Sequence, residues 1–377
     1  METIRYSKNN LDFSQEIRTR VKEYFTENNI QQYGNRQIIV KTIFMAVLYF
    51  VPYILMTTGI VSGAIWVLLS YFIMGLGMAG LGMGTMHDAN HGSFSRSKKT
   101  NKFFSMSLYL LGGFPSNWRF QHNTLHHGYT NIEGHDGDIA PVAILKFSPH
   151  QPHKAIHRYQ YLYAWFFYSL MTISWITMND FKKIIRYKKM GANLNSKKPF
   201  SALFSELILS KILYYGIFLF VPMFVLPIAW YWFVAGFILM HLTGGIILST
   251  IFQTAHVVPT SNYPLPDENN EISNNWAVHQ LYTTSNFSPN SRIFSWFIGG
   301  LNYQVIHHLF PQVSHIHYKN IAPIVQAAAE KYGLPYYVNR NFFAAVYEHT
   351  KMLKQLGRKT IEKEIEFNSS LSQASGM

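Results

Sequence analysis

The stretch TIFMAVLYFVPYILMTTGIVSGAIWVLLSYFIMGLGMAGLGMGTM, residues 42–86, contains no Lys, Arg, Asp, Glu or His, and it decides the fold class. A helix that crosses about 30 Å of hydrocarbon needs about 20 residues, so this stretch is long enough for two crossings and a turn. A second stretch, residues 212–266, contains two histidines and no charged residue. We therefore predict an all-α integral membrane protein with four transmembrane helices in two hairpins, near residues 40–58, 61–84, 207–225 and 228–254.

The remaining sequence is more polar and predicts a large aqueous portion. Of the 377 residues, 14% are charged, against about 25% in soluble domains. The mean hydropathy of +0.01 is nevertheless too low for a chain that lies wholly in lipid. We expect one membrane domain over residues 1–377, with a helical cap formed by residues 85–206 and 255–360 and a frayed tail at 361–377. The chain has no cysteine, so any metal must be bound by nitrogen or oxygen.

The basic residues indicate how the chain is oriented in the membrane. Six precede Lys41, 15 lie between the two hairpins and nine follow the second hairpin, whereas the two predicted turns contain none. By the positive-inside rule, the N-terminus, the cap and the C-terminus are all expected on the cytoplasmic side. The net charge of +13 then reflects topology and anionic lipid, and no nucleic acid partner is expected.

Three histidine motifs lie in the predicted cap or at its border: HDANH at 87–91, HNTLHH at 122–127 and QVIHH at 304–308. Residues three or four apart on a helix share one face, so each motif presents several side chains in one direction. A further histidine ends the second hairpin. One histidine pair at this spacing is common by chance, but three such motifs on one membrane side indicate a metal centre. The candidate ligands are His87, His91, His122, His126, His127, His256, Gln304, His307 and His308.

This ligand set is too large for one metal ion. A protein-bound zinc takes about four ligands, so eight histidines and one glutamine suit a dinuclear site. Imidazole is a suitable ligand for iron, copper, zinc and nickel, and the residues alone leave the metal open. Asp88, Asn90 and His315 lie close in sequence to the ligands and are expected to orient imidazoles from outside.

With these motifs, the sequence resembles the integral-membrane fatty-acid desaturases. The stretch GGLNYQVIHHLFP at 299–311 is similar to the front-end branch, which includes linoleoyl-CoA-desaturase-like proteins, and FQTAH at 252–256 matches the segment that carries an additional ligand. The resemblance implies a di-iron centre that uses O2 and two electrons to introduce a double bond into an acyl chain, on acyl-CoA or phospholipid. It also implies Δ5- or Δ6-like regiochemistry, although Ile306 stands where many front-end enzymes have Glu.

Three further expectations accompany this resemblance. Many front-end enzymes carry a fused cytochrome b5 domain with a haem-binding HPGG motif, which this sequence lacks, so a separate ferredoxin or cytochrome b5 is the expected electron donor. Trp118 lies four residues before His122 and either lines the acyl tunnel or anchors in the headgroup region. The basic run at 182–189 similarly either binds phosphate or is a solvated juxtamembrane segment.

Two alternative functions stay open on the sequence. A membrane hydroxylase or ketolase uses the same iron pair, and histidine motifs do not determine which reaction completes the oxidation once the first hydrogen is removed. A non-catalytic metal carrier would need polar residues along an ion path through its spans. Only His241 stands in the middle of a predicted span, which disfavours a carrier.

Overall fold

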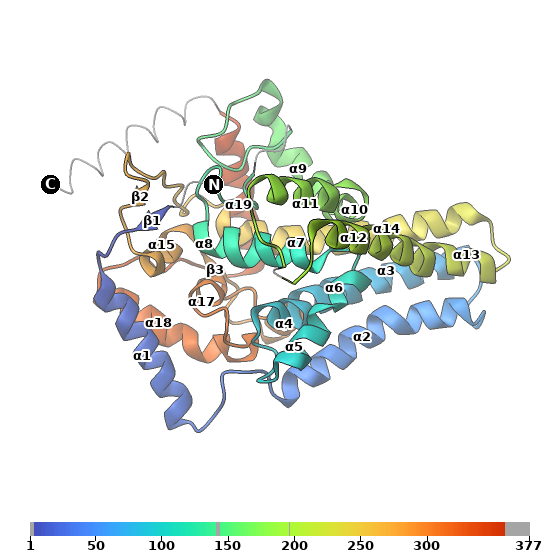
Figure 1. The fold of residues 1–377 in the computed structure, drawn as a ribbon, viewed down its shortest axis with the longest axis horizontal. Helices are drawn as coiled ribbons and strands as arrows, with labels where there is room; N and C mark the ends of the chain where they lie inside the picture. The colour runs from blue at the N-terminus through green and yellow to red at the C-terminus, as the bar shows by residue number, and fades with distance from the viewer. Residues whose placement is uncertain (1–3, 141–143, 196, 359–377) are drawn as a thin grey trace.

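A computed structural model describes residues 4–140, 144–195 and 197–358, and the predicted tail at 361–377 lies outside this range. Among the described residues, four helices are long and apolar enough to cross a membrane. They extend together to one end of the molecule, and the shorter helices lie beside them and at the other end (Figure 1). The prediction of a mainly helical protein with four candidate spans is confirmed. These spans cover Arg36–Thr57, Ala64–His91, Phe200–Val225 and Trp230–His256.

The second span is longer than the predicted 61–84 because nothing interrupts it before Gly92. It consists of α3 (Ala64–Gly80), the π-helical turn η1 (Leu81–Met86) and α4 (His87–His91). Gly92 ends it with a φ of 75°, a left-handed conformation that favours glycine. The first histidine motif is therefore the last turn of a membrane helix. The third span is likewise composite, with α12 (Phe200–Tyr215), the π-helical turn η5 (Gly216–Phe220) and α13 (Val221–Val225).

Helices α3 and α14 (Trp230–His256) form the centre of the membrane bundle, and α2 (Arg36–Thr57) packs on α3. The windows of the second and fourth spans are 56% and 61% buried, against 28% and 22% for the first and third. Glycines allow the close approach. A Cβ at Gly77 would lie 2.6 Å from the backbone nitrogen of Tyr49, and one at Gly75 would lie 2.7 Å from the carbonyl oxygen of Met240.

Short helices form a cap at the end of the bundle where the second and fourth spans finish, and several of those between the hairpins also pack along the side of α14. Between the two hairpins, the chain forms α5 (Lys98–Ser105), α6 (Ser107–Leu110), α7 (Pro115–Arg119), the π-helical turn η2 (Phe120–His126), α8 (His127–Tyr129), the 3-10 turn η3 (Ala155–Tyr159), α9 (Gln160–Ser169), α10 (Met171–Ser174), the π-helical turn η4 (Trp175–Asn179) and α11 (Asp180–Lys189).

The N-terminal helix and the segment after α14 complete the cap. They form α1 (Leu11–Glu27), α15 (Trp276–Thr283), α16 (Arg292–Phe297), α17 (Gln304–Leu309), the 3-10 turn η6 (His315–His317), α18 (Tyr318–Lys331) and α19 (Phe342–Leu356). Two parallel pairs of two-residue strands tie distant parts together: β1 (Arg5–Tyr6) with β2 (Glu271–Ile272), and β3 (Asn286–Phe287) with β4 (Val338–Asn339). A core of side chains such as Phe13, Val305 and Ile321 buries α17 between α1, α15 and α18.

Candidate metal centre

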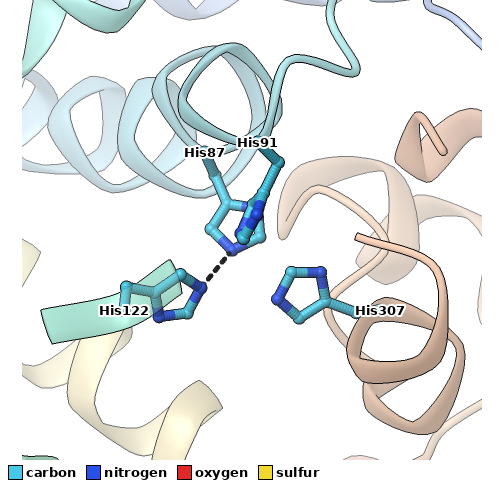
Figure 2. A group of neighbouring side chains, drawn as sticks. All are labelled: His87, His91, His122 and His307. Carbon is cyan, nitrogen blue, oxygen red and sulfur yellow. Dashed lines mark hydrogen bonds between the residues drawn. The ribbon is translucent and has the colours of Figure 1, made fainter. Parts of the chain in front are cut away.

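The first histidine motif points into the interior from the end of the second span. His87 and His91 lie one turn apart on α4 with their ring centroids 4.8 Å apart. The π-helical turn η1 directly precedes them, and such turns are frequent at functional sites. Figure 2 shows both rings facing those of His122 and His307, which come from other parts of the chain.

The second motif lies on η2 and α8, against the first. The Nε2 atom of His122 is 3.1 Å from that of His87, and 3.3 Å from that of His127. The prediction that His122 and His126 share one face is correct, and their rings stack at a centroid distance of 5.4 Å. The backbone between them is π-helical over Phe120–His126, where a regular α-helix was expected.

The third motif approaches from α17 on the opposite side. The Nε2 atom of His307 is 3.0 Å from that of His127. His308 instead faces His126 and the last residue of α14, His256, with ring centroids 4.8 Å and 4.7 Å away. Gln304, at the start of α17, is fully buried.

The potential ligand atoms form two neighbouring groups. Within each group, the atoms lie within 4.8 Å of one another. His87, His91, His122 and His307 make one group, and His126, His256 and His308 make the other. His127 belongs with both histidines of the third motif, and a further group of His122, His126 and Asp138 also joins the first two groups. All eight predicted histidines thus meet, contributed by four separate segments.

Buried atoms without partners test whether metal ions fit here. Unpartnered buried polar atoms are costly, and the great majority in proteins are hydrogen-bonded. In the described part of the chain, several inward nitrogen atoms have no hydrogen-bond partner, and neither does the side-chain amide of Gln304. Bound cations would satisfy these atoms, so the residues fit a dinuclear metal site. The nitrogen atoms are Nε2 of His91, His126, His256 and His308.

The imidazoles outside the spans are held in a form that suits metal binding. Burial, together with repulsion from neighbouring imidazoles, holds the pKa of four of them well below the ordinary 6.5: His122, His127, His307 and His308. At neutral pH these rings are uncharged, and each therefore has a lone pair to donate.

His126 differs from the other histidines because two carboxylates face it. Burial lowers its pKa, but Asp136 and Asp138 outweigh burial and raise the pKa to about 9. The Nδ1 atom of His126 is 3.2 Å from both carboxylate oxygens of Asp136. A carboxylate on Nδ1 fixes the orientation of the ring, and a bound metal would take the place of the proton on Nε2. The only sequence signal for this carboxylate was an Asp-Gly-Asp segment ten residues downstream.

Other histidines are oriented by residues that the sequence did not single out. His307 Nδ1 is 3.2 Å from the hydroxyl of Tyr318, and His308 Nδ1 is 2.8 Å from the side-chain oxygen of Gln280. His256 Nδ1 lies 3.3 Å from the carbonyl oxygen of Thr283. These contacts join residues that are 11 to 28 positions apart in the chain.

The predicted orienting residues Asp88, Asn90 and His315 have other contacts. Asn90 donates to the carbonyl oxygen of Met86 at 2.9 Å. Asp88 accepts from the hydroxyl of Ser314 at 2.7 Å and lies 2.9 Å from His315 Nδ1. This arrangement ties the first motif to the segment that follows the third.

A largely apolar cavity of about 530 Å³ adjoins the histidines. Its wall includes His122, His126, His256 and Trp118. Lys182, Lys183 and Arg186, from the basic run on α11, line another part of the same cavity. A separate space of about 20 Å³ lies beside His87, Trp118 and Gly82, between the second and fourth spans.

Comparison with known proteins places these features in a family context. Residues 62–340 match the family model for Fatty acid desaturase. A protein of Arthrospira platensis named sn-1 linoleoyl-lipid 6-desaturase is 32% identical, over 94% of this chain and 95% of its own length. A protein of the same name from Synechocystis sp. is 31% identical, over 92% of this chain and 96% of its own length. An acyl-lipid (8-3)-desaturase of Physcomitrium patens is 32% identical, over 92% of this chain and 72% of its own length.

Proposed function

The chain belongs to the fatty acid desaturase family, and we propose that it introduces a front-end double bond into the acyl chain of a membrane lipid at a pair of iron ions. The observation that carries this proposal is the pair of adjacent histidine groups with buried, unpartnered nitrogen atoms. The family and its enzymatic class follow from the comparisons. We propose the iron pair, its ligands and the lipid-linked substrate.

The two histidine groups suggest which residues hold each ion. His87, His91, His122 and His307 would bind one ion, and His126, His256 and His308 the other, with His127 between them and Gln304 beside the second group. An iron pair, when bound and supplied with O2 and two electrons, provides the oxidising power to remove hydrogen from an unactivated C–H bond. Neutral imidazoles suit such a centre because they add no negative charge to it.

The protein itself would bind and orient the acyl chain. The cavity beside the histidines is lined mostly by apolar side chains such as Leu108, Phe114 and Phe252, which suit hydrocarbon and exclude water. Trp118 and Phe252 also line the smaller space beside Gly82, so these two side chains border both spaces. An acyl chain that follows this wall would pass His122 and then His87.

The basic side chains of α11 support a substrate with an anionic head. Lys182 and Arg186 are exposed, and Lys183 contacts Gln121, which in turn contacts Asp138 beside His126. Phosphate next to these cations would hold the head of the substrate at one end of the cavity. The names of the relatives favour an acyl-lipid over acyl-CoA and a position near that of 6-desaturases.

The orientation and electron donor are part of the same proposal. The concentration of basic residues outside the hairpins supports a cytoplasmic centre, with both termini on that side. A separate ferredoxin or cytochrome b5 is the electron donor that we propose.

The proposal is tested by product analysis in a host that supplies linoleoyl lipids and a reduced ferredoxin. We expect a new double bond on the carboxyl side of the existing ones, located by mass spectrometry. His126→Ala and His308→Ala should abolish the product, whereas His153→Ala should retain it, because the His153 ring contacts the carbonyl oxygen of Gly357 and the ring of His157, away from the centre. Product formation by either ligand variant, or oxygenated lipids without new double bonds, would contradict the proposal.

A further inference from the structure

Another pocket, of about 200 Å³, lies away from the cavity beside the histidines and shares no lining residue with it. It is enclosed by the start of α2, by α16 and by the segment around η6. Three of its lining residues are cationic, and no carboxylate is among the described residues that line it. Its polar lining side chains include Gln37, Lys41, Ser291, Arg292, Ser295 and Lys319.

Lys41 is the unusual member of this pocket because its side chain is only 2% exposed. An ammonium group has three hydrogens to donate, and a buried one is costly unless they are accepted. The one acceptor for Nζ among the described residues is Nε2 of His315, at 2.7 Å. The ring of Trp296 lies 5.6 Å away on another side. The remaining donor capacity of Lys41 is therefore free for a ligand in the pocket.

Two more cations surround Lys41 and are not neutralised by the protein. Arg292 and Lys319 are exposed, and neither forms an ion pair within the described residues. Hydroxyl and amide groups from Ser291, Ser295 and Gln37 supply further neutral donors. Three cations and several donors without a carboxylate are the chemistry of a phosphate site.

The surroundings of the pocket favour lipid as the source of the phosphate. On α16, Ile293 is 84% exposed and Trp296 is 39% exposed. The Trp296 ring packs edge-on against Phe44, an exposed residue of the first span, at a centroid distance of 5.3 Å. Exposed apolar and tryptophan side chains beside a membrane helix mark the interface between hydrocarbon and headgroups.

We propose that this pocket binds the phosphate of an anionic phospholipid from the leaflet that faces the cap. The acyl chains of the lipid would lie along Phe44 and Ile293, and its phosphate would pair with Lys41, Arg292 and Lys319. A flat protein surface is a poorer partner because it cannot reach Lys41 at the bottom of the pocket. This site is independent of the proposed acyl substrate.

The proposed lipid also has a connection to the metal centre. Lys41 contacts Nε2 of His315, whose Nδ1 lies 2.9 Å from Asp88, and Asp88 is adjacent to His87 in the chain. A phosphate beside Lys41 would complete the neutralisation of this buried cation and so stabilise the contact between α4 and η6. Lys41 and His315 are positioning residues here and do not touch the substrate.

Native mass spectrometry of the full-length protein tests the site, with phosphatidylglycerol, phosphatidylcholine or inorganic phosphate added in turn. We expect wild type to retain phosphatidylglycerol in preference to phosphatidylcholine. The surface variant Arg292→Gln/Lys319→Gln should lower this retention by about tenfold or more, because it removes two of the three cations that would attract the phosphate. A matched control, Lys98→Gln/Lys99→Gln, removes two exposed charges from α5 and should retain lipid as wild type does.

Several other results would contradict the proposal. Equal retention of both lipids, or unchanged retention in the surface variant, would overturn the proposal. Displacement of the lipid by millimolar inorganic phosphate would show a free-phosphate site instead of a lipid site. If the surface variant loses affinity only for a reduced acidic ferredoxin, the pocket belongs to a protein-docking surface and the lipid proposal is wrong. If the variant Lys41→Met folds, it provides a second test. It should lower the retention of phosphatidylglycerol as the surface variant does.

Discussion

The indole of Trp118 stacks on the imidazole of His122, with ring centroids 4.4 Å apart and planes inclined by 29°. Trp118 also contacts the rings of His87 and His91 edge-on, at 5.8 Å and 6.1 Å. Trp118 therefore contacts three members of the first histidine group and also lines the apolar cavity. This relationship makes Trp118 the clearest probe of how an acyl chain is placed.

Substitution of Trp118 by Ala should impair catalysis without removing metal. The variant keeps every candidate ligand but loses the aromatic wall beside His122, so we expect activity to fall by about tenfold or more. Trp118→Phe keeps an aromatic ring and should retain more activity. The check is the rate of product formation together with the iron content of the purified protein. Loss of iron from Trp118→Ala would show that the residue supports the ligands and not the substrate.

Filling the small space beside Gly82 should change which acyl chains are accepted. A Cβ at Gly82 would lie 3.6 Å from both Leu111 and Leu248, an ordinary contact, so Gly82→Ala should behave like wild type. The larger side chain in Gly82→Val would occupy the space of about 20 Å³ next to His87 and Trp118. We expect the valine variant to favour shorter acyl chains, measured as the product ratio from mixed-length lipids. An unchanged ratio would mean that the chain does not extend there.

Removal of the carboxylate on His126 should weaken metal binding. In Asp136→Asn the ring loses its charged partner on Nδ1, and changes of this kind cost about 10- to 100-fold in metal affinity. The measurement is retained iron after dialysis against a chelator, compared with Glu268→Gln, which removes an exposed charge far along the chain. Equal retention in the two variants would exclude a role for Asp136 in the centre.

Acid should destabilise the fold through buried histidines that lie outside the metal centre. His349 is held by Tyr168 and the carbonyl oxygen of Val257, and burial lowers its pKa to about 4. Because the unfolded chain binds a proton near pH 6.5 and the folded chain only near pH 4, folding stability falls as pH drops between these values. At about pH 5.5 the loss from this residue is about 1 kcal/mol relative to neutral pH. Thermal unfolding at both pH values should show a smaller shift for His349→Gln than for wild type.

The sequence predicted the parts of this protein that depend on local patterns. Charge-free stretches identified the four candidate spans because a charged side chain in hydrocarbon is costly, and the spacing within the histidine motifs identified the residues that converge. The continuation of the second span to His91 was missed because the prediction ended the helix where the hydrocarbon would end. Helix formation stopped only at Gly92, where the backbone requires a left-handed conformation.

Residues that act through tertiary contacts could not be predicted from the sequence. Gln280 reaches His308 from α15, and Tyr318 reaches His307 from the start of α18, although neither belongs to a recognisable motif. Asp136 reaches His126 because the loop after α8 folds back, which no periodicity predicts. The π-helical turns at Leu81–Met86 and Phe120–His126 likewise had no signal in the sequence.

The central claim is that these histidines hold two iron ions, and metal analysis of the active protein with Mössbauer spectroscopy tests it most directly. Protein purified from iron-replete cells should contain about two iron ions per chain in nitrogen-rich surroundings, and removal of the iron should abolish desaturation until iron is restored. A fully active protein that contains a single ion, or only redox-silent zinc, would contradict the claim.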